Sequence, residues 1–401
     1  MAPPSKMKLA IFATHPIQNQ VPVWRELAKI PDIDLKVVYA SDFSVKGYRD
    51  KQFGVDVKWD QPMLDGYDSV VLGHAQRRGY FSLDGRGIVN ALADFQPDCG
   101  LVCAYEPKFY PDAILYLKAH KAGVLMRADL TDEDRTRTWY LKLLRDFYAK
   151  WIYSKIDRFC IIGKISIPHL LRFGIGEERI VKAGYNVDDA LFVAQRERFE
   201  PQREVLRKEM AIPRDGFVFL MPAKLIDKKR PDLLLEAYLN LPEALRQKIH
   251  IIFMGDGALK PSLQRRLEGE VIQHVHFSGF VNQAELGSYY TICDAVVLPS
   301  AYAETWGLVI NEAMIFGRPC LVSDRVGSRH DLVIEGKTGM IFPSGDQASL
   351  EEKIARMVTW IEQDRSIITK ECLKLGDEYT AFNAAAGIAQ AMRNNLAERH
   401  G

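Results

Sequence analysis

The sequence predicts an α/β protein made of two domains, each built on a parallel β-sheet. Its 401 residues suit two domains of about 150–200 residues, because a single hydrophobic core rarely grows much larger. Short apolar runs alternate with longer amphipathic stretches, which is the pattern of βαβ units. The runs are apolar throughout rather than alternating, as a parallel sheet covered on both faces requires.

Strand candidates occur in two sets separated by a charged segment. The first set lies at 8–14, 34–40, 69–73, 99–104, 123–128 and 158–163. The second set lies at 217–223, 250–255, 275–279, 295–300, 319–324 and 339–344. The charged segment 194–216 between them predicts the domain junction, and the alanine-rich segment 380–400 predicts a terminal helix.

Composition and charge narrow the class of protein. Hydrophobic residues make up 47% and charged residues 26%, as in ordinary globular proteins. The net charge of +1 gives no sign of a nucleic-acid partner, which would show as a basic excess. The first apolar run, 9–13, is too short for a signal-peptide core, and no run approaches the roughly 18–20 apolar residues of a membrane span. The sequence therefore predicts a cytoplasmic protein.

The cysteines are scattered and fall mostly inside apolar runs. Cys99 and Cys103 have neither a zinc-site spacing nor that of a redox CxxC pair. We expect all six to be reduced thiols in the core: Cys99, Cys103, Cys160, Cys293, Cys320 and Cys372.

Residues 304–312, ETWGLVINE, place two glutamates around a glycine after a strand candidate. We expect a helix to begin near Gly307, where free backbone N–H groups and the positive end of the helix dipole suit a phosphate. Glu304 would then precede the helix and Glu312 would lie about one and a half turns into it, so the two acids could address opposite ends of one elongated ligand. On the spacing alone, the simpler interpretation is one helix-dipole acid and one solvated helix acid.

A basic loop follows the strand candidate 217–223. It contains four cations: Lys224, Lys228, Lys229 and Arg230. A helix is expected to start at Pro231 and Asp232, because proline and aspartate both suit a first turn. Four cations at the carboxyl edge of a sheet would be a natural counter-charge for a diphosphate, and a solvated basic loop explains the segment equally well.

Together these segments resemble the donor site of the retaining glycosyltransferases of family 4. The resemblance rests on the acid–seven residues–acid motif at 304–312, the loop AKLIDKKR at 223–230, and GDG at 255–257. The segments 277–300 and 317–346 also follow the family's pattern and spacing. The resemblance is strong from about residue 184 to 346 and extends weakly over the whole chain.

The resemblance implies the GT-B fold, in which two Rossmann-like parallel-sheet domains face each other across a cleft. It implies an acceptor-binding domain over residues 1–192 and a nucleotide-sugar-binding domain over 193–374. The final segment, 375–401, would form a helix that crosses back to the N-terminal domain. Open parallel sheets bind ligands beyond the carboxyl ends of their strands, so the loops facing the cleft should carry the function.

The resemblance also assigns residues to the donor's diphosphate. Lys224 stands at the family's usual arginine position and Lys229 at its usual lysine, and both would hold the phosphates. A lysine keeps the charge of arginine but loses the bidentate fork. Gly307, Leu308 and Val309 would offer backbone amides to the phosphates and the sugar.

Three further residues would contact the rest of the donor. Val281 would meet the base through its main chain, Glu312 would accept hydrogen bonds from the ribose, and Glu304 would face the transferred sugar. The implied reaction retains the anomeric configuration, and the leaving nucleoside diphosphate takes the acceptor's proton, so Glu304 need not be a nucleophile. The catalytic residues would be Glu304, Lys224 and Lys229. The two lysines would stabilise the charge of the leaving group. Because no suitable loop carries a DxD-type metal site, we expect a metal-independent enzyme without a cofactor.

The N-terminal half departs from the family's pattern. His15 stands where the family has a glycine pair, and Gln20 stands where it has a histidine. His15 could contact acceptor or sugar, and a structural role explains it equally well. In the loop 127–137, Asp129 could receive a polyhydroxyl acceptor, while Thr131 is interpreted as the N-cap of a helix with an acidic first turn.

The segment 139–155 is aromatic and basic. A helix of this kind can lie in a membrane interface, and enzymes of the resembled family often act on lipid-linked glycans. The preferred interpretation is a core helix with a basic outer edge. The implied partners are a nucleotide-sugar donor and a saccharide, lipid-linked or small-molecule acceptor, with peripheral contact at the inner membrane face as an open alternative.

Other functions fit the sequence less well. The double-glutamate motif argues against a GT-B nucleotide-sugar epimerase, and a phosphorylase would need a cofactor lysine, for which there is no marker. A nicotinamide-dependent dehydrogenase would need G-x-G-x-x-G after a strand, and the segment at 255–257 lacks the third glycine. A non-catalytic nucleotide- or carbohydrate-binding protein stays open.

Overall fold

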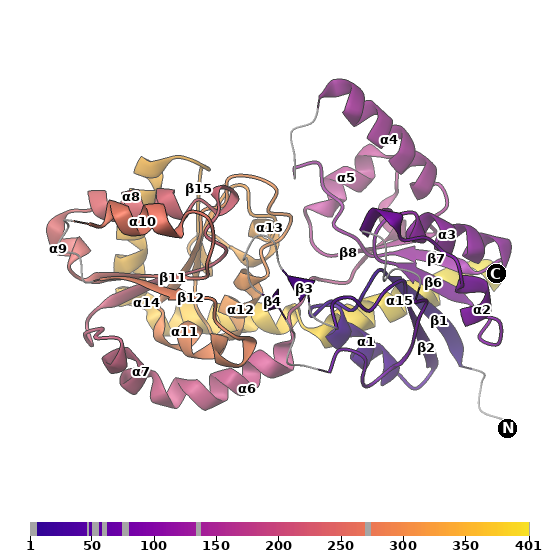
Figure 1. Ribbon diagram of the computed structural model, residues 1–401, viewed down its shortest axis with the longest axis horizontal. Coiled ribbons are helices and arrows are strands. Elements are labelled where there is room, and N and C mark those ends of the chain that lie inside the picture. Colours follow the sequence, from indigo (N-terminus) through magenta and orange to yellow (C-terminus); the bar gives the residue numbers. More distant parts are fainter. Residues whose placement is uncertain are drawn as a thin grey trace.

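The computed structural model describes residues 6–45, 48–49, 56–57, 62–73, 80–133, 138–268 and 274–400. These residues form two separate parallel sheets with helices packed around them (Figure 1), which confirms the predicted α/β class and the two Rossmann-like domains. Every strand candidate of the sequence becomes a strand.

The N-terminal sheet is parallel throughout and has the order β5-β2-β1-β6-β7-β8-β9. Its strands are β1 (Met7–Ala13), β2 (Ile33–Tyr39), β5 (Asp68–Val71), β6 (Cys99–Val102), β7 (Gly123–Met126), β8 (Arg158–Ile161) and β9 (Ile180–Lys182). Its helices are α1 (Val21–Ala28), α2 (Ile88–Ala91), α3 (Phe109–Ala119), α4 (Trp139–Tyr153) and α5 (Ser166–Arg172). A short antiparallel pair is formed by β3 (Tyr48–Arg49) and β4 (Asp56–Val57).

The C-terminal sheet is also parallel and has the order β12-β11-β10-β13-β14-β15. Its strands are β10 (Phe217–Pro222), β11 (Ile249–Met254), β12 (Val275–Gly279), β13 (Ala295–Leu298), β14 (Cys320–Ser323) and β15 (Gly339–Phe342). The remaining helices are α6 (Asp189–Phe199), α7 (Arg203–Glu209), α8 (Pro231–Asn240), α9 (Glu243–Arg246), α10 (Lys260–Arg266), α11 (Leu286–Ile292), α12 (Val309–Ile315), α13 (Arg329–Leu332), α14 (Gln347–Glu378) and α15 (Ala381–His400). Short 3₁₀ turns lie at Tyr80–Ser82, Glu177–Arg179, Glu200–Gln202, Asp227–Lys229 and Gln283–Glu285.

The charged segment 194–216 forms helix rather than a loose junction. Most of it lies in α6 and α7, which pack against α11 of the C-terminal domain. The expected boundary at 192/193 therefore falls inside α6, and the one at 374/375 falls inside α14. The chain passes between the sheets in the short stretch between β9 and α6.

The C-terminal helix α15 packs on the N-terminal domain, against α1 and the strands β7, β8 and β9 (Figure 1). Its buried face is made of small and aliphatic side chains: Ala381, Ala384, Ala385, Ile388, Ala389, Ala391 and Met392. At Gly387 a Cβ atom would lie 2.1 Å from the carbonyl oxygen of Lys182, so the helix approaches β9 too closely for any side chain there. The alanines thus allow the close packing that joins the end of the chain to its first domain.

The hydrophobic cores lie on the faces of the two sheets. Two clusters of buried side chains cover the opposite faces of the N-terminal sheet, and a third fills the C-terminal domain. All six cysteines are free thiols, and all except the half-buried Cys103 are fully buried. Among the described residues, no helix has the length and apolar character needed to cross a bilayer.

Helix α4 corrects one prediction. Only Ala149, Ile152 and Tyr153 of this helix are buried, and its large apolar side chains are exposed. The interpretation of 139–155 as a core helix is therefore wrong. The periodicity of the sequence showed an apolar face, but the neighbouring elements cover the opposite one.

Candidate functional site

The candidate site lies where the strand order of the C-terminal sheet changes direction. Strands β10 and β13 are neighbours, with β11 and β12 on one side and β14 and β15 on the other. Loops that leave such a switch point diverge and open a crevice at the carboxyl ends of the strands. A pocket of about 1060 Å³ lies there, lined by the basic loop after β10 and by the loop and helix after β13.

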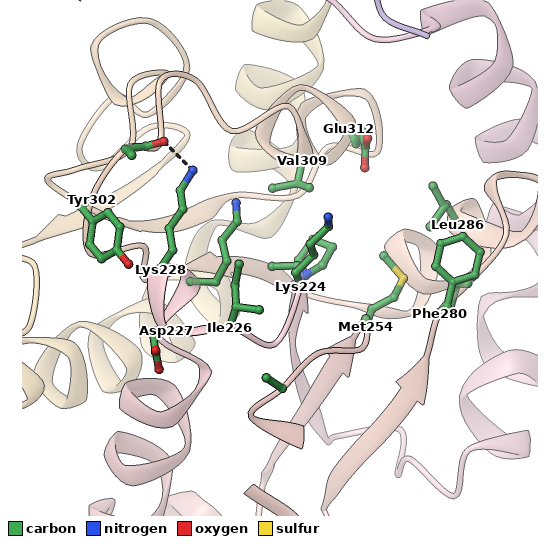
Figure 2. A pocket seen from close by; sticks show the side chains of 17 residues that line it. Lys224, Ile226, Asp227, Lys228, Met254, Phe280, Leu286, Tyr302, Val309 and Glu312 are labelled. Atoms are coloured by element: carbon green, nitrogen blue, oxygen red, sulfur yellow. Dashed lines mark hydrogen bonds between the residues drawn. The ribbon is translucent and has the colours of Figure 1, made fainter. Parts of the chain in front are cut away.

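The basic loop brings three lysines to this pocket. Lys224, Lys228 and Lys229 line it, and Figure 2 shows the Lys224 side chain pointing into it beside Lys228. The Nζ atom of Lys228 donates a hydrogen bond to the Ala303 carbonyl at 2.5 Å. Arg230, the fourth cation of the loop, instead pairs with Asp232 at 2.9 Å. The helix α8 begins at Pro231 as predicted.

Glu304 faces these lysines across the switch point. Its side chain is only 10% exposed, and its Oε2 atom contacts the Nζ of Lys229 and accepts a hydrogen bond from the Ser300 hydroxyl at 3.0 Å. The Gly327 amide donates to the Glu304 carbonyl at 2.9 Å, which fixes the loop from β14. Ala303, just before it, has a φ of +52°, a strained value for a residue with a side chain. The carboxylate is thus held by Lys229 and Ser300, and the backbone of the residue is held by Gly327.

Gly307 is required by both conformation and space. Its φ is +92°, and a Cβ atom would lie 2.9 Å from a methyl group of Leu298. The following helix, α12, begins at Val309, two residues later than the sequence predicted. Val309 lines the large pocket, and Leu308 lines a neighbouring one.

Glu312 lies in the first turn of α12, nearer the start of the helix than predicted, and lines both pockets (Figure 2). Its Oε2 atom contacts the hydroxyl of Tyr290 on α11. The Tyr290 ring is buried, stacks on Phe316 at 5.4 Å and meets Phe192 edge-on at 6.4 Å. Burial raises the pKa of the Glu312 carboxyl to about 7, although the hydrogen bond from Tyr290 acts in the opposite direction.

Sequence reasoning missed Tyr290. Nothing in the pattern of α11 marks this tyrosine, because its relation to Glu312 arises only when α11 packs beside α12. Its rigid packing leaves one oxygen of Glu312 committed to the protein, so the other oxygen is the one available to a ligand.

The opposite end of the large pocket is apolar. Met254, Phe280, Val281 and Leu286 line it, and Figure 2 shows three of these side chains grouped on the far side of Lys224 from Lys228. The pocket therefore runs from a basic end to an apolar end, and Glu312 lies along it.

His15 lies at the end of β1 and reaches the C-terminal domain's site. It lines the neighbouring pocket of about 430 Å³ together with Leu308 and Glu312. The imidazole packs on Phe43 at 4.3 Å and hydrogen bonds the Thr14 hydroxyl at 3.0 Å. Burial lowers the pKa of His15 to about 4, so the ring is neutral at pH 7.

Asp129 is also brought to the site, but through a protein contact. Its Oδ2 atom accepts a hydrogen bond at 3.0 Å from the hydroxyl of Thr305, the residue after Glu304. Glu133 makes a second bridge between the domains, to Arg329 at 2.8 Å.

The Thr131 hydroxyl accepts a hydrogen bond from the Glu133 amide at 3.1 Å. The next helix among the described residues is α4, which begins at Trp139, so the capping role of Thr131 stays a prediction. The acidic side chain of Asp132 pairs with Arg145. Residues 134–137 of the predicted loop lie outside the described residues.

Trp306, within the motif itself, joins the two domains. Its Nε1 atom donates to the Asn311 side chain at 2.7 Å, and Asn311 donates to the Tyr185 carbonyl at 2.9 Å. A Cβ atom on Gly163, after β8, would lie 2.1 Å from the Trp306 ring, so glycine is needed for this contact. Sequence reasoning missed this role because the partner residues belong to the other domain.

The described residues include no group of three or more His, Cys, Asp or Glu side chains placed to hold a metal ion. The charge at the site is supplied by lysines, and the buried carboxylates are each paired with a protein group.

Comparisons with known sequences relate mainly to the C-terminal half. Residues 202–370 match the family model described as Glycosyl transferases group 1. Alpha-monoglucosyldiacylglycerol synthase of Acholeplasma laidlawii is 30% identical over 201 residues, which cover 50% of this chain and 46% of that protein. D-inositol 3-phosphate glycosyltransferase 2 of Catenulispora acidiphila is 30% identical over 173 residues, 40% of each chain. The match thus spans less than half the length of these relatives.

Comparisons with solved structures cover the whole chain. A glycosyltransferase from Rickettsia africae ESF-5 aligns with a TM-score of 0.73 and 15% identity, over 98% of this chain and 99% of that one. Anabaena HepE in complex with UDP aligns with a TM-score of 0.67 and 15% identity, over 97% and 99%, and it is also known in complex with UDP-glucose. At this identity the likeness bears on the fold, and it confirms the predicted GT-B arrangement.

Proposed function

We propose that this protein transfers a sugar from a nucleoside diphosphate sugar to a hydroxyl acceptor. Residues 202–370 match the family model of the glycosyl transferases group 1, and the whole chain has the GT-B fold. The observation that carries the proposal is the convergence of Lys224, Lys228 and Lys229 with Glu304 at the switch point of the C-terminal sheet. Cations on one loop and a fixed carboxylate on the next are what a diphosphate and its attached sugar require.

The shape of the pocket supports a nucleotide sugar as the donor. A base fits the apolar end at Val281 and Phe280, and the diphosphate fits the basic end. Glu312 lies along the pocket with one oxygen held by Tyr290, which leaves the other to accept from ribose hydroxyls. The complexes of the structural relative HepE with UDP and UDP-glucose support the same class of donor.

We propose that the reaction retains the anomeric configuration. Lys224 and Lys229 stabilise the charge that develops on the leaving diphosphate, and the leaving phosphate takes the proton of the acceptor hydroxyl on the same face. Glu304 faces the anomeric carbon and stabilises its positive charge without forming a bond. The lysines supply the charge that a divalent cation would otherwise provide, so we propose a metal-independent reaction. The acceptor, a saccharide, a lipid-linked glycan or a small molecule, enters from the N-terminal domain beside His15.

Lys229→Ala is expected to weaken nucleoside diphosphate binding by about 10- to 100-fold, the usual contribution of a charge-assisted hydrogen bond in a partly buried site. The measurement is calorimetric titration of wild type and variant with UDP, GDP, ADP and dTDP, with and without EDTA. Wild type should bind one base selectively, and EDTA should make no difference.

Lys353→Ala is the matched control, because Lys353 pairs with Glu335 at the surface of the C-terminal domain. It should bind like wild type. Equal affinity of Lys229→Ala and wild type, or no binding of any nucleotide, would overturn the assignment of the diphosphate site.

Donor binding is expected to strengthen about tenfold between pH 6 and pH 8. With a pKa of about 7, the Glu312 carboxyl is mostly neutral at pH 6 and mostly ionised at pH 8, and only the ionised form can accept from both ribose hydroxyls. The probe is the hexose ester of the preferred nucleoside diphosphate, because its diphosphate does not titrate in this range. Glu312→Gln should bind more weakly with a flat pH profile. If donor binding by Glu312→Gln depends on pH as steeply as it does in wild type, the titrating group is not Glu312.

A further inference from the structure

Helix α4 presents its apolar side to solvent. Phe147 is 80% exposed, Trp139 74% and Leu144 67%. Leu143, Tyr140 and Trp151 on the same helix are also exposed. Isolated exposed apolar residues are common on proteins, but a contiguous set on one helix marks a surface that binds something apolar.

The spacing places these side chains on one face. Tyr140, Leu143, Leu144, Phe147 and Trp151 follow each other at intervals of three or four residues, which is the repeat of one side of a helix. We call these five residues the outer stripe. The opposite side of the helix carries the buried Ala149, Ile152 and Tyr153. Figure 1 shows α4 projecting from the N-terminal domain on the side away from α1 and α15.

The charges on this face are positive. Lys150 is exposed beside the outer stripe, and the ammonium group of Lys155, just after the helix, lies over the ring of Trp151 at 5.0 Å. The one acid of the helix, Asp146, is paired with Arg172 at 2.6 Å and with Arg145 at 3.2 Å. The surface therefore combines apolar and aromatic groups with cations whose charge is not cancelled by acids of the same helix.

A groove beside the outer stripe has the same character. It has a volume of about 570 Å³ and lies between α4 and the end of α5. Its lining combines apolar side chains with Lys150 and the ion pair of Asp146 and Arg172; the apolar residues are Leu143, Leu144, Phe147 and Phe173. An acyl chain below an anionic headgroup would meet both kinds of group.

We propose that α4 docks the N-terminal domain onto an anionic lipid bilayer, with the outer stripe in the interfacial layer and the lysines at the headgroups. Three features favour a bilayer over a protein partner. The surface is the exposed side of a projecting helix, its aromatic residues include Trp and Tyr, and lysines flank it; all three are characteristic of interfacial helices. The proposal does not depend on the transferase reaction, because vesicle binding requires neither donor nor acceptor.

The test is flotation of the full chain with vesicles of phosphatidylcholine alone or mixed with phosphatidylglycerol, at low and high salt. Wild type should float with the mixed vesicles, and binding should weaken as salt rises. The double variant Leu144→Gln/Phe147→Gln should bind at least tenfold more weakly and still fold, because both side chains are exposed. Phe382→Gln, which changes an exposed phenylalanine on α15, is the matched control and should bind like wild type.

Two outcomes would overturn the proposal. In one, wild type does not float with either vesicle, or the double variant floats equally well. In the other, light scattering shows a dimer that the double variant abolishes while vesicles bind neither protein, which would assign the outer stripe to a second copy of the chain. Nucleotide binding by the double variant, measured in parallel, should be unchanged, so loss of vesicle binding is separable from any failure of the donor site.

Discussion

Glu304→Gln is expected to lower turnover of the donor sugar by about 100- to 1,000-fold while leaving nucleoside diphosphate affinity within a few-fold of wild type. The variant keeps the shape of the side chain and can still accept the hydrogen bond from Ser300. In the proposed reaction, it removes the charge that faces the anomeric carbon, where positive charge develops only in the transition state. The loss should therefore appear in kcat rather than in binding.

The measurement combines initial rates of donor consumption with calorimetric binding of the nucleoside diphosphate. Glu236→Gln, a surface glutamate paired with Arg266, is the control and should behave as wild type in both. Unchanged turnover would remove Glu304 from the reaction. A wild type that binds the nucleotide but consumes no donor with any acceptor would instead favour a non-catalytic binding protein.

Asp294→Ala is expected to lower the free energy of unfolding by about 3–5 kcal/mol, the usual effect of removing one partner from a buried ion pair. The Asp294 side chain is 1% exposed and lies just before β13. Arg203 and Arg365 each donate to it at 2.7 Å, and Arg207 does so at 3.2 Å. The Val218 amide of β10 also donates at 2.8 Å. Removing the Asp294 carboxylate leaves these three arginines without the buried anion that they share.

Chemical denaturation of wild type and variant between pH 5 and pH 8 tests this expectation. Burial by itself raises the pKa of Asp294, but the arginines and the Val218 amide outweigh it and hold the pKa below its usual value. The stabilisation is therefore fully present above the ordinary aspartate pKa of about 4 and is lost only as the pH falls through the lower native value. The difference between the two proteins should be constant across the measured range.

Glu204→Ala is the control for this prediction. Glu204 and Arg214 form an exposed pair at 3.4 Å, and such pairs contribute about 0–1 kcal/mol. If Asp294→Ala is no more destabilising than Glu204→Ala, the three arginines must find other partners, and the cluster is not a centre of stability.

Local sequence was enough to predict the two sheets and the loops that bear function. Runs such as 217–223 and 295–298 are apolar at every position, as expected of a strand buried on both faces. Pro231 fixed the start of α8, since proline suits the first turn of a helix and disrupts any later one. The lysines and Glu304 of the site were visible because they lie in the loops that follow such strands.

Tertiary structure decided which of these residues meet. Lys229 contacts Glu304 because β10 and β13 pair, and Glu312 is held by Tyr290 because α11 packs beside α12. The Trp306 ring packs against Gly163 of the other domain, a contact that the local sequence does not contain. Such contacts join residues that are distant in sequence, so no local pattern contains them.

Helix α4 shows the same division most clearly. Its periodicity determined that Tyr140, Phe147 and Trp151 share a face, because the helical repeat depends only on the backbone. Whether that face turns inward or outward depends on which side the neighbouring elements cover. In this fold the N-terminal domain covers the side with Ala149 and Ile152, and the apolar stripe faces solvent.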